Sequence, residues 1–125
     1  RIRIMDALAR LRNGSLAMRR DRDYVLEAVG QSGLALQFAD RSLTRDREIV
    51  ITAVSRNGLA LDFASPDLQA DREVVLAAVL QNGLALRFAG GLLDSDRELV
   101  LAAVGQDGKA LAFACSTLRG DREVV

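Results

Sequence analysis

The chain has 125 residues, half of them hydrophobic, and its 17 basic residues balance its 17 acidic ones. This length allows one domain with a thin core, and the charge balance argues against a dedicated binder of nucleic acid or anionic membranes. One cysteine excludes an internal disulfide and fits a reducing, intracellular compartment, and no apolar run approaches the roughly 20 residues of a membrane span.

The first 20 residues differ from the rest of the chain. Residues 2–12 have the pattern of a long helix, and Asn13-Gly14 resembles a helix stop that recurs later. Gly14 lies only seven positions before Asp21, whereas Gly58 lies thirteen positions before Asp71. Residues 1–20 are therefore predicted to be an irregular N-terminal cap or a degenerate repeat.

A block of 25 residues recurs from Asp21 to the end of the chain. The full copies are 21–45, 46–70, 71–95 and 96–120, and residues 121–125 open a fifth. Apolar residues keep their offsets, as in the sets Val25, Val50, Val75, Val100 and Phe38, Phe63, Phe88, Phe113. A period of this length indicates stacked units that each bury an apolar face on their neighbours.

Each repeat opens with a predicted long helix. In the copy 71–95, Asp71 is placed to cap the helix N-terminus. The apolar stripe of this helix consists of Val74, Val75, Ala78 and Val79. Asn82-Gly83 is predicted to end the helix, because both residues tolerate the left-handed conformation that often follows a helix.

A second, shorter helix is predicted to follow in each repeat. In the same copy its apolar stripe contains Leu84, Ala85, Phe88 and Ala89. On this pattern we expect Phe63 and Phe88 to be buried, and a later leucine, Leu93, to return to the core.

The fold predicted from these elements is all-α, a right-handed solenoid-like stack of helical hairpin repeats of about 25 residues. Asn-Gly between apolar runs is also a hairpin signal, and leucine-rich repeats have similar periods, so a β-containing repeat is the alternative. The alanine pairs, the Asp-Arg-Glu opening and the spacing of apolar residues favour helices.

The motif DREVVLAAV, followed by QNGLAL, resembles a tandem-repeat family that is itself labelled a domain of unknown function. The resemblance covers residues 21–125. It implies helical repeats in tandem arrays, mostly in single-celled eukaryotes including algae, with no established activity or catalytic residues. The chain departs from the motif at Lys109, where other copies have leucine, and at Gly90-Gly91.

An arginine follows the opening aspartate of every copy, and equivalent residues should line up along the stack. This ladder consists of Arg22, Arg47, Arg72, Arg97 and Arg122. It is either a strip for acidic partners and phosphates or a set of ion pairs within and between repeats. Two acids accompany each arginine, which favours the ion pairs.

An enzyme is not expected. The chain has no histidine, and no metal-ligand spacing, phosphate loop or nucleophile elbow is present. Cys115 occupies the repeat position of Asp40, Ser65 and Gly90, so a small residue at a helix end explains it. No catalytic residue, cofactor or metal site is predicted.

The predicted function is a non-catalytic scaffold for protein–protein interaction, with a regular backbone and variable outward positions. The candidate interaction surface consists of Gln31, Arg56, Gln81 and Gln106, and of Gln37, Asp62 and Arg87. The alternatives are a structural accessory subunit of a larger assembly, which could be organellar or photosynthetic, and a helical repeat that reads nucleic acid. The partner is expected to be another protein of unknown identity.

The C-terminal end is expected to be covered by further repeats or a partner chain, because residues 121–125 only begin a unit. Leu118, Val124 and Val125 are predicted to be more exposed than their counterparts Leu68, Val74 and Val75.

Overall fold

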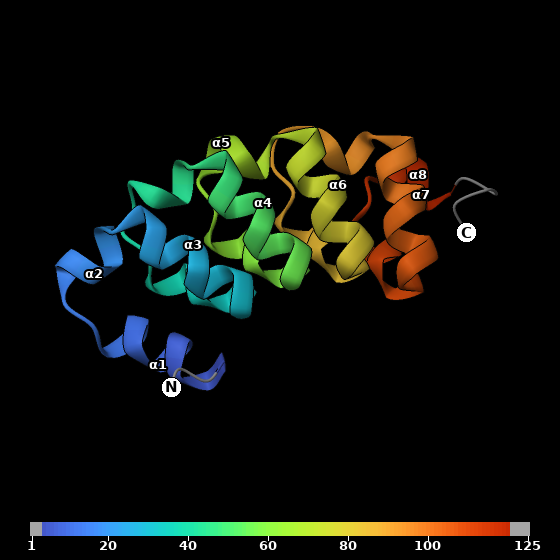
Figure 1. Cartoon of the computed structure of the whole chain (residues 1–125). Coiled ribbons are helices and arrows are strands. Elements are labelled where there is room, and N and C mark those ends of the chain that lie inside the picture. The colour runs from blue at the N-terminus through green and yellow to red at the C-terminus, as the bar shows by residue number, and fades with distance from the viewer. Residues whose placement is uncertain (1–3, 121–125) are drawn as a thin grey trace.

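A computed structural model describes residues 4–120, with side chains from residue 9 onward. Every regular element in that range is a helix, and the repeats lie side by side in one stack (Figure 1). The predicted all-α repeat architecture is confirmed, while its right-handedness stays a prediction.

Each repeat contains a long α-helix, a short 3₁₀-helix and a return segment. The long helices are α3 (Arg22–Gln31), α4 (Arg47–Arg56), α6 (Arg72–Gln81) and α7 (Arg97–Gln106). The 3₁₀-helices are η1 (Gly33–Phe38), η3 (Gly58–Phe63), η4 (Gly83–Phe88) and η6 (Gly108–Phe113). The return segments contain η2 (Leu43–Arg45), α5 (Pro66–Gln69), η5 (Leu93–Ser95) and α8 (Ser116–Arg119).

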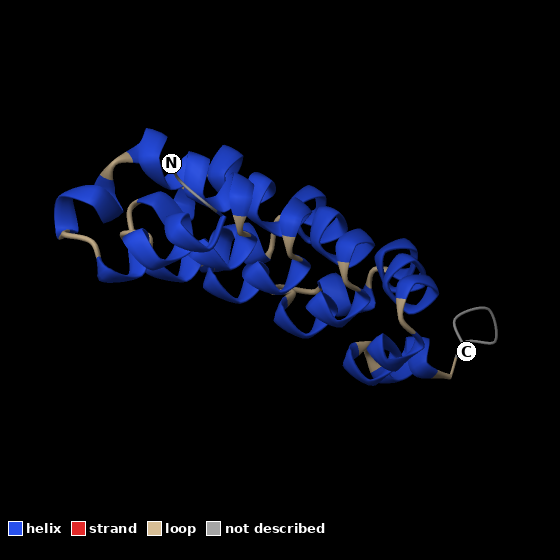
Figure 2. Ribbon diagram, turned by 60° about the horizontal axis from the view of Figure 1, so that its bottom comes forward, coloured by secondary structure: helices blue, strands red, loops and turns tan. Residues whose placement is uncertain are grey.

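The elements form two adjoining rows, linked by short loops (Figure 2). Long helices pack on long helices, 3₁₀-helices pack on 3₁₀-helices, and η1, η3 and η4 each also contact the long helix of the next repeat. The fully buried side chains between the rows include Val25, Val29, Val50, Val54, Val75, Val79, Leu36 and Leu61. Because valine, alanine and leucine are compact, the helices can approach closely.

The predicted aspartate caps are confirmed. The Asp46 carboxylate accepts hydrogen bonds from the backbone N–H groups of Glu48 and Ile49, at 3.1 and 3.3 Å. Asp71 does the same for the corresponding groups of its helix. Each carboxylate thus satisfies N–H groups that have no partner within the helix.

The Asn-Gly pairs end the long helices, as predicted, but they do so without the predicted left-handed conformation. Asn82 is extended (φ −150°, ψ 109°), and its side chain accepts a hydrogen bond from the backbone of Leu84 at 3.0 Å. Gly83 is required by packing, since a Cβ atom there would lie 2.2 Å from the backbone oxygen of Ala103 in the next repeat. Within residues 4–120, the one positive φ belongs to Gly91.

The predicted burial of the phenylalanines is also wrong. Phe63 and Phe88 are half-buried, whereas Leu61 and Leu86 are buried. The cause is the type of helix, because a 3₁₀-helix has three residues per turn and turns a different set of side chains inward than an α-helix does. Truncating either phenylalanine should therefore cost less than the roughly 3–5 kcal/mol of a fully buried site.

The N-terminal segment is the second half of a repeat. Helix α1 (Ile4–Asn13) packs on α3 and η1, which are the neighbours expected of a short helix from a preceding unit. Buried Leu11 lies 25 residues before Leu36, and Arg19 donates to the Leu11 backbone oxygen at 3.2 Å. The long helix predicted within residues 2–12 is present as the ten-residue α1, but it takes the place of a short helix in the stack. Helix α2 (Leu16–Arg20) is the return segment of this half repeat.

The predicted exposure at the C-terminal end is wrong for Leu118. Leu118 is 7% exposed and Leu68 is 8% exposed, because α8 packs this leucine into the core of its own repeat. Val124 and Val125 lie outside the described residues. The last repeat instead differs at Gly108, where an added Cβ would meet no atom within 4 Å. The predicted return of leucines to the core is confirmed at Leu43, Leu68 and Leu118, while Leu93 is half-buried.

Candidate interaction surface

The first predicted row of surface residues lies where each long helix ends. Gln81 Oε1 accepts a hydrogen bond from the Gly58 N–H at 2.5 Å, and Gln106 bonds to the Gly83 N–H in the same way. Two of these side chains therefore connect consecutive repeats. Arg56 is exposed, and the Gln31 amide oxygen is buried without a hydrogen-bond partner. Binding of a partner by this row stays a prediction.

The second predicted row lies on the 3₁₀-helices, and its members Gln37, Asp62 and Arg87 are all exposed. Because η1, η3 and η4 are neighbours, the three side chains follow one another along the stack. The Arg87 guanidinium lies over the Phe88 ring, 5.1 Å from its centroid, which holds the cation in place. The row thus presents an amide, an anion and a cation on equivalent backbone sites.

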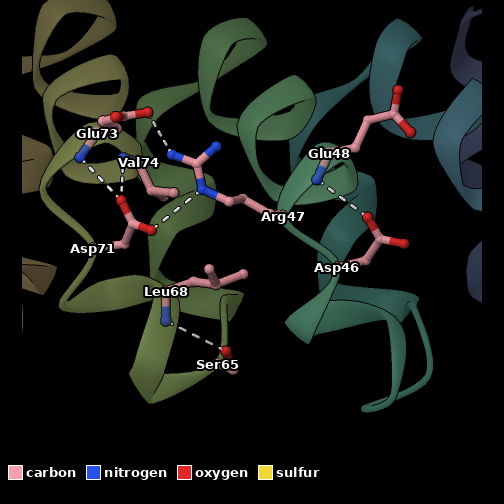
Figure 3. A network of polar contacts seen from close by, with 8 residues as sticks. All are labelled: Asp46, Arg47, Glu48, Ser65, Leu68, Asp71, Glu73 and Val74. Carbon is pink, nitrogen blue, oxygen red and sulfur yellow. Dashed lines mark hydrogen bonds and ion pairs between the residues drawn. The ribbon is translucent and has the colours of Figure 1, made fainter.

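The arginine ladder forms ion pairs between repeats. Arg47 Nε lies 3.3 Å from the Asp71 carboxylate, and Arg47 also contacts Glu73 at 2.6 Å (Figure 3). Arg22 binds Asp46 and Glu48, and Arg72 binds Asp96 and Glu98. The ion-pair interpretation is confirmed for these three arginines. Arg122 lies outside the described residues.

The ion pairs perturb the titration of the capping aspartates. The pKa of Asp46 is lowered, chiefly because Arg22 donates a hydrogen bond to its carboxylate. The pKa of Asp96 is lowered by the equivalent bond from Arg72. Each aspartate therefore caps its own helix and receives a cation from the preceding repeat, so it belongs to the framework of the stack rather than to a free anionic surface.

A groove that the sequence analysis did not identify lies between the return segments that contain η2 and α5. Its volume is about 580 Å³. Its lining residues are Ala39, Arg41, Thr44, Arg45, Phe63, Ala64, Ser65 and Pro66. The signal in the sequence was the pair Arg41 and Arg45, which no other copy has at these positions.

Residues 4–120 contain no cluster of three or more side chains placed to hold a metal ion. Cys115 is half-exposed at the N-terminus of α8, and the Leu118 backbone N–H lowers the pKa of its thiol. No helix in the described part of the chain is long and apolar enough to cross a membrane.

The repeats match a family model described as a domain of unknown function (DUF4116). The model matches three overlapping stretches, residues 21–69, 46–94 and 71–119, each of which spans nearly two repeats. Neither a curated protein nor a solved structure matches this chain.

Proposed function

The chain belongs to the DUF4116 family of domains of unknown function, and from this premise we propose that it is a non-catalytic scaffold that binds other proteins. The observation that supports the proposal is the short-helix row, Gln37, Asp62 and Arg87. These side chains differ in charge and are exposed, while the residues beneath them are the same in each repeat.

The regular part of each short helix explains how such a row can vary. Gly33, Gly58 and Gly83 are buried against the next repeat, and each is followed by a buried alanine and a buried leucine. The exposed residue after that leucine makes few contacts. Gln37 donates to the Leu34 backbone oxygen of its own helix, and the Arg87 guanidinium lies over Phe88 and over Phe113 of the next repeat. A change there alters what a partner meets without changing the core, which is how repeat proteins acquire specificity.

The proposal is tested by removing the row and measuring partner capture. A variant carrying Gln37→Ala, Asp62→Ala and Arg87→Ala should fold normally, as judged by circular dichroism, and should lose most proteins that the wild type captures from its native source. The matched control carries Glu27→Ala and Ser55→Ala, two exposed positions on the long helices, and should capture the same proteins as the wild type.

Two results would count against the proposal. Equal capture by the row variant and the control would show that this surface binds nothing. Recovery of one complex at fixed stoichiometry, unaffected by either variant, would favour a structural accessory subunit instead.

A further inference from the structure

The groove between the return segments that contain η2 and α5 combines an apolar base with a basic edge. Ala64 is buried, and Phe63 and Ala39 are half-buried, so these three supply apolar surface inside the groove. Arg41 and Arg45 are exposed at its border. A volume of about 580 Å³ is in the range of sites that accept a small ligand or a few side chains.

The two groove arginines have charges that the described residues leave unneutralised. No carboxylate in the described part of the chain bonds to Arg41 or Arg45, in contrast to the ladder arginines Arg22, Arg47 and Arg72. The acids next to them in sequence have other partners. Asp40 accepts hydrogen bonds from Ser42 and lies 3.4 Å from Arg20, and Asp46 pairs with Arg22.

The groove is particular to this place in the stack. The residues at the position of Arg41 in later copies are Pro66, Gly91 and Ser116, and those at the position of Arg45 are Ala70, Ser95 and Gly120. Thr44 also differs from its equivalents. Gln69 reaches back to the Leu61 backbone oxygen at 3.0 Å, whereas the shorter Thr44 bonds to the Arg41 oxygen at 2.8 Å.

We propose that this groove binds an acidic peptide segment that carries one apolar side chain. The apolar side chain packs against Phe63, Ala64 and Pro66, and flanking carboxylates pair with Arg41 and Arg45. Guanidinium groups suit this task because they bind carboxylates through two parallel hydrogen bonds. The proposal rests on the scaffold function and names the chemistry of one partner segment.

The charges favour a peptide over a nucleic acid. Binding of a nucleic acid requires a row of cations that follows its phosphates. The ladder arginines Arg22, Arg47 and Arg72 are instead paired with acids. The groove offers two guanidinium groups in a chain of zero net charge. Its apolar lining also adds nothing to the binding of a phosphate, whereas it suits an aromatic or aliphatic side chain.

The test is fluorescence anisotropy with a short glutamate-rich peptide that has one central phenylalanine. The double variant Arg41→Glu and Arg45→Glu should bind about tenfold more weakly than the wild type or not at all. Arg119→Glu is the control, because Arg119 is exposed at the position that Thr44 occupies in the first repeat. It should bind as the wild type does, and high salt should weaken binding to both. A peptide with serine in place of its phenylalanine should bind more weakly to the wild type.

Three results would overturn the proposal: no binding to the wild type, equal binding to the double variant, or the same loss in the Arg119→Glu control. Tighter, Arg41-dependent binding of a single-stranded RNA would reassign the groove to phosphates. If the peptide fails to bind but capture of native partners still depends on the short-helix row, the peptide-binding proposal is wrong and the scaffold proposal stands. If the peptide binds while capture does not depend on that row, the proposed role of the row is wrong and the peptide-binding proposal stands.

Discussion

The junctions between repeats and the return segments of the same stack differ in how strictly their sequences are constrained. At the junctions, the same contact recurs at Gly33, Gly58 and Gly83, where an added Cβ would lie 2.2–2.3 Å from a backbone oxygen of the next repeat. The return segments vary in sequence and in helix type, with 3₁₀ turns in η2 and η5 and α turns in α5 and α8.

One backbone hydrogen bond connects every return segment to the one before it. The bonds run from Asp40 N to Arg19 O, Ser65 N to Thr44 O, Gly90 N to Gln69 O, and Cys115 N to Asp94 O, at 2.7–3.0 Å. Because only backbone atoms take part, the side chains at these positions are free to differ. The glycines, which have no side chain, therefore set the spacing between repeats. The return segments tolerate different side chains, because only backbone atoms connect them.

The largest expected effect is at a junction glycine. Gly58→Ala should lower the free energy of unfolding by about 2–3 kcal/mol, because its Cβ would lie 2.3 Å from the Ala78 backbone oxygen and the next repeat would have to move. Gly108→Ala is the control, since its Cβ would meet no atom within 4 Å. It should be neutral or stabilise slightly through the lower entropy of the unfolded chain. Urea denaturation of both variants measures the difference, and equal losses would refute the junction contact.

A smaller effect is expected where ion pairs cross the junctions. The folded-state pKa of Asp46 lies below its unfolded value near 4, so its contribution is present above about pH 4 and is lost as pH falls through the folded pKa. Asp46→Asn keeps a capping side chain but removes this titration, and should reduce the acid sensitivity by up to about 1 kcal/mol. Melting curves recorded from pH 7 to pH 3 provide the test. Identical pH profiles for variant and wild type would show that the Arg22 pair contributes nothing.

The smallest effect is expected at a return segment. Cys115 holds the N-cap position of α8, where sulfur is a weak hydrogen-bond acceptor, whereas Ser65 caps α5. Cys115→Ser should therefore stabilise the chain by a few tenths of a kcal/mol, which thermal unfolding in parallel with wild type can detect. A loss as large as that of Gly58→Ala would mean that the return segments are as constrained as the junctions.

The sequence predicted the features that depend on residue type and on the fixed spacing of the repeats. The aspartate caps, the helical repeats and the pairing of Arg22, Arg47 and Arg72 followed from residue type and spacing. The role of Gly83 did not, because its critical contact is with Ala103 in the next repeat.

For the N-terminal segment, the position of Gly14 did not show which part of a repeat α1 replaces. The informative residue was Leu11, 25 positions before Leu36. At the candidate surface, exposure of Gln37, Asp62 and Arg87 followed from the pattern. The groove depends on how far the Thr44 side chain reaches, which the spacing of residues does not show.

The close approach at Gly33, Gly58 and Gly83 also means that each of these junctions fixes how one repeat is oriented against the next. The angle between two repeats at one junction determines the orientation of every later repeat. A small change at Gly58 would therefore rotate the third and fourth repeats together relative to the first two. The distance between side chains on remote repeats is then adjusted by residues that touch neither of them. Substitutions in the core can therefore change the curvature of the stack, and with it the size of the surface against which the stack can pack.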